Sequence, residues 1–573
     1  FQGCSSLTTL DVAGWNMSNA TSLCKMFEGC SSLTSLDLSG CEVSPSADLS
    51  DMFEGCTSLA SLNLSGCTAQ TARLLLQALS TPAAITSLGL SDMNLAGVED
   101  LSGMFEGLSS LESLDISGWD ISSVKDLSGM FSGMASLKSL DLTSWDVSGV
   151  EHFARMFDGC SSLASLDLSG WDVSRGTDLS TMLSGLSGLT ALDLSDWDAS
   201  CATSVLAGLT DPALLQSLRL SGLAVSQSNI SGMFEPLSGL TSLDVSNWTI
   251  SGSPNLSGML ASLPSLSSLN ISSWDVSGAT SLSGLFSGCA KIESLDLSGW
   301  DVSRVSDFSS MFAGDAALVS LDLSSWDVGS ACDLSLMFSG CESLESLDLS
   351  GWDVSSAKKF ASIFKGCSSL EHLCLSGWNL SSRTDLSPIF ADCSALVTLD
   401  LSNWKAVGAT GLSSMLSGCG CLESLNLSGW DASAARSILS GLSDPSRLSY
   451  LSLTNLSVST GANISSMFSG LSGLSALDLS GWTVSGTPQM SGLFTSLASL
   501  SSLNLSSWDV SRALNLSGLF RGCSSLTSLD LSGWDVSSAT SLCSMFSGCS
   551  SLTSLDLSGW DVSSATDLSY MFA

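Results

Sequence analysis

The sequence has very few of the residues that carry acid–base chemistry or bind anionic polymers. Its 573 residues include two histidines, His152 and His372, and only 18 lysines and arginines against 55 acidic residues. A serine or cysteine nucleophile needs a base and an orienting group, which two histidines far apart in a repetitive chain do not supply. The net charge of −37 has the wrong sign for binding a phosphate backbone. The composition therefore predicts a protein that is not an enzyme, needs no cofactor and binds no nucleic acid.

Long apolar runs and paired metal-binding cysteines are also missing. No stretch approaches the ~18 consecutive apolar residues of a membrane span, although 44% of the residues are hydrophobic. The 19 cysteines include no C-x-x-C pair, and one cysteine per repeat does not converge into a tetrahedral site. No signal peptide is visible. We therefore expect no zinc centre and no direct membrane insertion in this segment.

What the sequence has in abundance is one repeat. Anchored on the second leucine of L-x-x-L-D-L-S-G-W-D-V, 22 repeats follow at 26 residues each, with one step of 25 between Leu218 and Leu243. A fixed period over the whole length predicts a solenoid, in which each coil buries its apolar face against its neighbours. At roughly 4.8 Å per coil, such a stack would be about 105 Å long. We expect residues 1–573 to form a single continuous α/β repeat solenoid.

Two features concern the extent of this solenoid. The sequence starts mid-repeat at Phe1 and stops mid-repeat at Ala573 without polar caps, which predicts the ordered part of a longer or processed protein. Residues 248–254 recur as residues 482–488, which are 234 positions later. A block of nine coils, about 193–310 and 426–544, is therefore interpreted as an internal duplication. Growth by added coils is typical of spacers, scaffolds and adhesive arrays.

Each repeat divides into a strand half and a helical half. The pattern L-x-x-L-x-L alternates with period 2 and predicts a short strand. The next apolar residues have the spacing of one helical face and predict one or two turns of helix; in one coil they are Leu542, Met545, Phe546 and Cys549. We expect a long parallel sheet on one side and short helices or 3-10 turns on the other. Residues 68–85, 199–215 and 432–448 depart from the consensus, which predicts a longer helix in these coils.

The strand half resembles the leucine-rich repeat L-x-x-L-x-L-x-x-N-x-L, with Trp in the place of Asn. The whole repeat is more similar to the 25–26-residue repeats of BspA-like and mycoplasma-type surface proteins, with the pattern L-D-L-S-x-W-D-x-S-x-x-x-D-M-S-x-M-F-x-G-C. Residues 166–174 and 544–549 carry this pattern, and the resemblance covers essentially the whole chain. It implies an extracellular or cell-surface repeat protein, often proposed to act in adhesion. It transfers no single binding residue, because the motif is itself the structural repeat.

All 17 tryptophans occupy one phase of the repeat. An exposed aromatic row could stack on sugars, whereas a buried row would pack each ring on the next coil. The remaining five coils decide between these readings, because they carry only apolar residues at this phase, namely Cys41, Cys67, Met93, Leu223 and Leu456. The pattern therefore predicts a buried column.

Eleven cysteines share a second phase, where the other coils carry mainly Leu and Pro, one Met and Asp315. Free replacement by apolar residues favours a column of buried thiols. Neighbouring coils nevertheless bring Cα atoms into disulfide range. Cys41 and Cys67, which replace Trp in adjacent coils, are the candidate disulfide pair.

Aspartate follows the anchor leucine in 14 of the 22 coils. Carboxylates stacked at this spacing repel one another, so three outcomes stay open: raised pKa values, hydrogen bonds from flanking serines, or bound cations. The weak candidates for divalent cations are Asp115, Asp141, Asp167 and Asp193. A second Asp column, in W-D-V, predicts turn-capping residues.

Thirteen N-x-S/T sequons occur in the chain. A change from Asp to Asn in this framework creates a sequon automatically, so several are accidental, whereas the others would mark a secreted glycoprotein. The glycosylation candidates are Asn16, Asn19, Asn229, Asn247, Asn255 and Asn515.

Two functions follow from these patterns. The first is a non-enzymatic extracellular or cell-surface repeat protein that acts as an adhesive or protein-binding array. The alternative is a structural spacer or a subunit of an extracellular filament, sheath or appendage. The family resemblance and the long, repetitive, acidic sheet favour the first function, although binding surfaces favour exposed Trp, Tyr and Arg, which weakens it. The featureless surface, the duplicated nine-coil block and the uncapped ends favour the second. The expected partners are other proteins or copies of the chain itself, possibly end to end. An intracellular leucine-rich scaffold is the third reading.

Overall fold

The computed structural model describes residues 1–116, 118–226, 233–252, 255–376, 378, 380, 384–402, 404, 408–458, 461–484 and 486–573. The chain forms two compact units. Unit 1 comprises Phe1–Pro254 with Leu263–Asp275, and unit 2 comprises Asn255–Ser262 with Val276–Ala573. Each unit is a parallel β-solenoid with few helices, which confirms the predicted fold class. That the two units form one continuous body stays a prediction.

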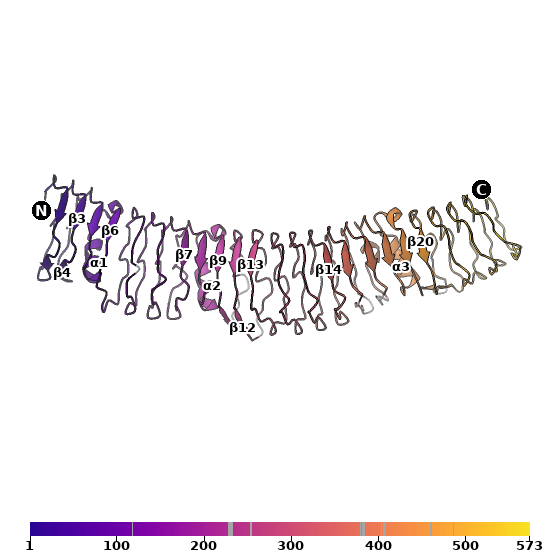
Figure 1. Cartoon of the computed structure of the whole chain (residues 1–573), viewed down its shortest axis with the longest axis horizontal. Helices are drawn as coiled ribbons and strands as arrows, with labels where there is room; N and C mark the ends of the chain where they lie inside the picture. Colours follow the sequence, from indigo (N-terminus) through magenta and orange to yellow (C-terminus); the bar gives the residue numbers. More distant parts are fainter. Residues whose placement is uncertain are drawn as a thin grey trace. The chain divides into compact units, whose positions relative to one another are not determined.

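The strands of unit 1 form parallel sheets in sequence order. A four-stranded sheet has the order β1-β3-β5-β6, and a five-stranded sheet has the order β13-β11-β9-β8-β7; Figure 1 labels β7, β9 and β13 of the second sheet. Two-stranded ladders pair β2 with β4 and β10 with β12. The strands are β1 (Thr9–Asp11), β2 (Asn16–Met17), β3 (Ser35–Asp37), β4 (Glu42–Val43), β5 (Ser61–Asn63), β6 (Ser87–Gly89), β7 (Ser165–Asp167), β8 (Ala191–Asp193), β9 (Ser217–Arg219), β10 (Ala224–Ser226), β11 (Ser242–Asp244), β12 (Thr249–Ser251) and β13 (Ser268–Asn270).

Unit 2 repeats this arrangement. A four-stranded sheet has the order β16-β17-β18-β20, and two-stranded ladders pair β14 with β15 and β19 with β21. The strands are β14 (Ser346–Asp348), β15 (His372–Cys374), β16 (Thr398–Asp400), β17 (Ser424–Asn426), β18 (Tyr450–Ser452), β19 (Ser457–Val458), β20 (Ala476–Asp478) and β21 (Thr483–Val484). Isolated bridges such as Ser294↔Ser320 continue the pairing between the named strands. Among the described residues, the predicted long sheet is therefore present as short parallel sheets and isolated bridges.

The strand register follows the leucine anchors. Leu10 pairs with Leu36 in β1 and β3, and Leu425 pairs with Leu451 in β17 and β18. The one irregular step of the repeat keeps the same register, since Leu243 pairs with Leu218. A shift by one residue would turn each inward leucine to the solvent face, so burial of the leucines fixes the alignment of the coils.

In the consensus coils the side opposite the strands consists of successive i→i+3 turns, in place of the one or two turns of helix that the apolar spacing predicts. The segment from Leu542 to Cys549 forms successive turns, in which alternate N–H groups donate to the next coil: Leu542 to Asp567 (2.9 Å), Phe546 to Met571 (2.8 Å). Between them, Met545 donates to Leu542 at 3.2 Å. Ser544 has a φ of 57°, and this left-handed conformation interrupts the helical run. The apolar side chains still point inward, because Leu542, Met545 and Phe546 are all buried.

The three departing coils contain the longer helices that the sequence predicts. They are α1 (Ala69–Gln77), α2 (Ala199–Ala207) and α3 (Ala432–Leu439), each followed by a short 3-10 turn: η1 (Pro82–Ala84), η2 (Pro212–Leu214) and η4 (Pro445–Arg447). A further 3-10 turn, η3, spans Leu412–Ser414. The side chains of Thr68, Asp198 and Asp431 cap the helices by accepting a backbone N–H of the first turn. Within the described ranges, no helix combines the length and apolar character that a bilayer crossing requires.

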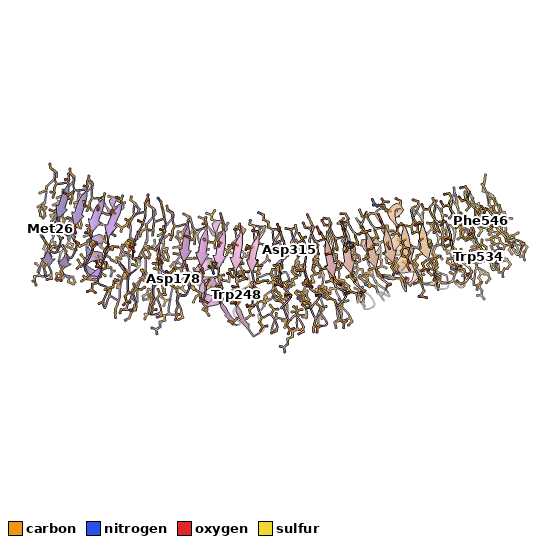
Figure 2. All side chains as sticks on the ribbon, in the orientation of Figure 1. Met26, Asp178, Trp248, Asp315, Trp534 and Phe546 are labelled. Atoms are coloured by element: carbon orange, nitrogen blue, oxygen red, sulfur yellow. The ribbon has the colours of Figure 1, made fainter. Side chains whose placement is uncertain are left out.

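The interior of the coils is apolar and contains the aromatic columns. Trp534 and Phe546, labelled in Figure 2, are 4% and 3% exposed. Phenylalanines of successive coils stack, with ring centroids 5.6 Å apart for Phe338 and Phe312 and 5.6 Å apart for Phe364 and Phe390. Each coil therefore buries its rings against the next coil, as the fixed period requires.

Candidate binding surface

The buried tryptophan column is confirmed, and it also carries hydrogen bonds. In the middle of the units the rings are almost fully covered; Trp352 is 1% exposed. The Trp352 indole N–H donates to the carbonyl of Leu323, 29 residues earlier, at 3.3 Å, and Trp197 donates likewise to Leu168 at 2.8 Å. The two ends of the column are less covered: Trp15 in the first coil is 44% exposed, and Trp560 in the last coil is only partly buried. The column is thus part of the core and leaves the surface to polar side chains.

The cysteine column uses the same 29-residue spacing. Cys393 Sγ donates to the carbonyl of Phe364 at 3.1 Å, and Cys160 Sγ donates to Phe131 at 3.1 Å. Burial raises the pKa of Cys160 to about 12, and desolvation also raises the pKa of Cys393 well above its ordinary value. These thiols stay protonated at neutral pH and are therefore weak nucleophiles.

Cys41 and Cys67, the candidate disulfide pair, are buried free thiols in adjacent coils. Cys41 Sγ donates to Val12 at 3.3 Å, and Cys67 Sγ donates to Leu38 at 3.2 Å. Both therefore make the bond that Trp makes at this phase in other coils. Desolvation raises the pKa of Cys67 to about 11. A covalent bond between the two stays a prediction.

Aspartates followed two residues later by Ser or Thr mark three corners of the consensus coil. In the last coil Asp556, Asp561 and Asp567 each accept the backbone N–H of the serine two positions later, at 3.0, 2.9 and 3.0 Å. Hydrogen bonds from these serines hold the pKa of all three carboxyls below the ordinary value. The aspartates are therefore turn residues that remain ionised. The sequence predicted this role for the W-D-V column alone.

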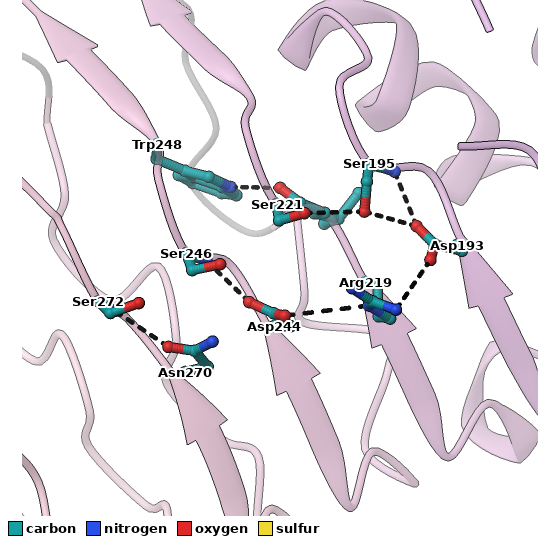
Figure 3. A network of polar contacts seen from close by, with 10 residues as sticks. Asp193, Ser195, Arg219, Ser221, Asp244, Ser246, Trp248, Asn270 and Ser272 are labelled. Carbon is teal, nitrogen blue, oxygen red and sulfur yellow. Dashed lines mark hydrogen bonds and ion pairs between the residues drawn. The ribbon is translucent and has the colours of Figure 1, made fainter. Parts of the chain in front are cut away.

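The strand-face aspartates also accept hydrogen bonds from the residue two positions later. Of the three outcomes left open, the structure has hydrogen bonds from the flanking Ser or Thr. In Figure 3, Asp193 accepts from Ser195 through both its N–H (3.0 Å) and its hydroxyl (2.6 Å), and Asn270 accepts from Ser272 at 3.2 Å. Arg219 stands between two aspartates of neighbouring strands, 3.5 Å from Asp193 and 3.9 Å from Asp244. Asparagine thus preserves the turn, and one arginine offsets two carboxylates.

The weak cation candidates are distributed along this face. Asp141 accepts from Thr143 (3.1 Å from N–H), which lowers its pKa, and Asp167 accepts from the N–H of Ser169 at 3.0 Å. Asp115 is exposed. Among the described residues, no group of three or more His, Cys, Asp or Glu side chains is arranged to hold a metal ion. Cation binding at these positions stays a prediction.

The glycosylation candidates that the structure describes are Asn16, Asn19, Asn247, Asn255 and Asn515, and all are exposed. Asn16 is partly engaged, because its amide donates to Glu42 at 3.1 Å. Asn229 lies outside the described residues. Glycosylation stays a prediction.

Two polar features, one in the interior and one at the surface, have properties that sequence reasoning did not predict. Asp315 stands in the cysteine column and is 1% exposed (Figure 2). Its Oδ1 accepts the N–H of Cys289 at 2.8 Å, whereas its Oδ2 has no partner among the described residues. Desolvation raises its pKa to about 8. The second feature is a cleft of about 760 Å³ beside α3, lined by Arg436, Asn463 and several serines.

Comparisons with known proteins identify a family and a set of distant structural neighbours. A family model described as "Mycoplasma protein of unknown function, DUF285" matches residues 1–73, 75–197, 228–347, 332–450 and 462–573. No curated protein matches the sequence.

Solved structures with similarity to the chain include three leucine-rich-repeat or receptor proteins. A leucine-rich-repeat protein of Leptospira interrogans is 15% identical with a TM-score of 0.23, covering 82% of this chain and 90% of that one. An internalin of Listeria monocytogenes is 14% identical with a TM-score of 0.20, covering 83% and 88%. The ectodomain of the Arabidopsis receptor kinase HAESA, solved with a peptide hormone, is 17% identical with a TM-score of 0.25, covering 89% and 82%.

Proposed function

The chain belongs to the family described as Mycoplasma protein of unknown function, DUF285, and from this premise we propose that it is a non-enzymatic repeat protein of the cell surface or extracellular space that binds other proteins as an adhesive array. The supporting observation is the exposed row of aspartates on the strand face. Asp296, Asp322 and Asp348 follow one another at one per coil, and each accepts the N–H of the residue two positions later, at 3.2, 3.0 and 2.9 Å. These bonds lower the pKa of all three carboxyls, so the row is ionised at neutral pH.

A row of like charges at a constant spacing recognises a partner by electrostatic complementarity. The matching surface is a protein segment with regularly placed lysine or arginine side chains. The net charge of −37 speeds the encounter with such a partner at low salt. Repetition adds avidity, because each further coil that is engaged binds at a high effective concentration. Many weak contacts along the row replace the aromatic hot spots that the core has buried.

The row can be tested without disturbing the fold. Asn270 makes the same turn bond as aspartate, so the triple variant Asp296→Asn, Asp322→Asn, Asp348→Asn removes three charges and keeps the turns. Beads coated with the full chain should adhere to epithelial cells and to a surface carrying a lysine-rich peptide. The triple variant should reduce adhesion at least about tenfold, because each lost charge weakens every engaged coil.

The matched control is the triple variant Asp301→Asn, Asp327→Asn, Asp353→Asn, which removes three charges from the W-D-V corners instead. It should retain most of the adhesion. Equal losses in both variants would show that net charge, and not the strand face, attracts the partner. A different result would favour the structural spacer over this proposal: the beads adhere to neither surface, and the chain sediments as end-to-end assemblies.

A further inference from the structure

One cleft of unit 2 differs in chemistry from the acidic surface around it. It has a volume of about 760 Å³, within the range of small-molecule sites. It lies beside α3 and is bordered by the coil that follows this helix. Of the described residues that line it, Arg436 is the only charged side chain. The polar lining also includes Asn463 and five serines, namely Ser433, Ser437, Ser440, Ser466 and Ser469.

Arg436 has a counterpart in another coil, and the two arginines differ in the residue that faces them. Arg73 of α1 occupies the same position of its repeat as Arg436 of α3, since each lies eleven residues after its anchor leucine. Arg73 Nη1 is 2.6 Å from Asp100 Oδ2, and its other Nη donates to Ser102 at 2.9 Å. The guanidinium of α1 is therefore neutralised by a carboxylate of the next coil.

At α3 this carboxylate is replaced by an amide. Asn463 occupies the position of Asp100, twelve residues after the anchor leucine of the following coil. The Oδ1 atom of Asn463 accepts the N–H of Ser465 at 3.1 Å, which leaves the amide N–H₂ as the donor end of the side chain. The difference of one residue thus separates a coil with an ion pair from a coil with a cationic group beside a cleft.

From this arrangement we propose that the cleft binds an acidic sugar, with its carboxylate on Arg436 and its hydroxyls on the surrounding serines and Asn463. The planar guanidinium forms paired hydrogen bonds with a carboxylate. Serine hydroxyls both donate and accept hydrogen bonds, which suits a ligand with several hydroxyls. The inference goes beyond the proposed protein-binding function and does not depend on it, because it concerns a different surface and a different class of ligand.

The test is a calorimetric titration of the full chain with glucuronate, glucose and acetate. Glucuronate should bind, glucose should bind at least about tenfold more weakly because it lacks the charge, and acetate should also be weaker because it lacks the hydroxyls. Arg436→Ala should reduce glucuronate affinity at least about tenfold. Arg73→Ala is the matched control and should leave binding unchanged. Acetate binding as tightly as glucuronate would overturn the assignment of a sugar.

A second variant keeps Arg436 and tests whether ligand binding is lost when a carboxylate is placed beside the guanidinium. Asn463→Asp restores the carboxylate found at Asp100, so Arg436 should pair with it and glucuronate binding should fall at least about tenfold. Thermal unfolding confirms that each variant is folded. Unchanged glucuronate binding in both Arg436→Ala and Asn463→Asp would overturn the site. Adhesion of coated beads should be unaffected by Asn463→Asp, so failure here is distinguishable from failure of the proposed function.

Discussion

At the scale of single residues, the interior is held by hydrogen-bond donors as well as by apolar area. Trp352 and Cys393 both donate to a carbonyl 29 residues earlier. The carbonyls of Leu323 and Phe364 also accept the turn N–H groups of Trp326 and Cys367, so each side-chain donor adds a second hydrogen bond to a carbonyl that has two lone pairs. Cys41 and Cys67 donate across the same spacing at the tryptophan phase, which explains why a thiol can replace an indole there.

Truncation of a buried indole should be costly. We predict that Trp352→Ala destabilises its region by about 3–5 kcal/mol, because it leaves a cavity and removes the donor to Leu323. Urea unfolding followed by tryptophan fluorescence measures the change. Trp15→Ala is the control, since Trp15 is 44% exposed, and it should cost much less. Similar losses for both variants would contradict the role of burial.

Asp315 should make stability depend on pH in the neutral range. Its folded pKa of about 8 exceeds the ordinary unfolded value of about 3.9, so the folded state holds a proton that the unfolded state has lost. Stability from this group is complete below about pH 4 and is lost as pH rises to about 8, by at most about 1.4 kcal/mol per pH unit. Unfolding midpoints measured from pH 4 to 9 should show this decline.

Asp315→Asn is the control for this titration, because it has a similar shape and no acid group. Its stability should be nearly constant across the same range and should exceed that of the natural chain at pH 8. Cys289 and Cys341 are the titratable neighbours of Asp315 in the column. A decline that persists in Asp315→Asn would assign the pH dependence to other groups.

At the scale of elements, the strand half was predictable and the turn half was only partly so. The period-2 pattern identifies the inward leucines, and burial then fixes their register. The three longer helices also follow from local sequence, because their capping side chains and alanines are recognisable. The turn half was taken for a helix, since the inward spacing of Leu542, Met545 and Phe546 is the same in both structures. The left-handed residue is Ser544 in this coil but glycine at the same phase of others, such as Gly103 and Gly518. A glycine that recurs at one phase is the signal that could have identified the turn.

The cleft beside α3 could not be recognised from a single repeat. Its character depends on Arg436 and on Asn463, which are 27 residues apart and belong to different coils. A comparison between coils would have found it, because Arg73 and Asp100 have the same separation and opposite charges. The cleft is therefore indicated by two residues of neighbouring coils taken together, and not by a motif within one coil.

Close approach of glycines between coils should make some of these turns intolerant of a side chain. Gly185 has a φ of 73°, and a Cβ atom there would collide with the backbone nitrogen of Gly159. We predict that Gly185→Ala lowers stability by about 1–3 kcal/mol through strain. Gly118→Ala is the control, since it has no heavy atom within 4 Å of the added Cβ. Thermal unfolding should separate the two variants clearly; equal melting temperatures would contradict the role of this contact.

At the scale of the whole molecule, the many carboxylates should also make the folded state less stable in acid. Asp296, Asp322 and Asp530 illustrate the many carboxyls whose pKa is lowered by serine hydrogen bonds. A lowered folded pKa gives stability that is present above about pH 4 and is lost as pH falls through the folded pKa. We therefore predict that the melting temperature falls steeply below about pH 4.

Together with Asp315, this effect should place the maximum of stability near pH 4–5. Melting curves between pH 2 and pH 9 measure both limits. The acidic limit should be unchanged in Asp315→Asn, because it depends on the turn aspartates. A melting temperature that rises steadily down to pH 2 would show that repulsion between the carboxylates outweighs their hydrogen bonds from serine.

The 29-residue spacing of the interior donors affects how a gene that encodes such repeats can gain or lose coils. Where an indole or thiol of these columns donates a hydrogen bond across this spacing, the acceptor lies in the coil immediately before it, as Trp197 bonds to Leu168 and Cys393 bonds to Phe364. Misaligned recombination between two repeats removes or adds whole coils and keeps the reading frame. The coils that meet at the new junction then offer each other the same carbonyls and rings as before. Variants of different length can therefore arise in one genetic step, and selection can choose among lengths without first repairing the core.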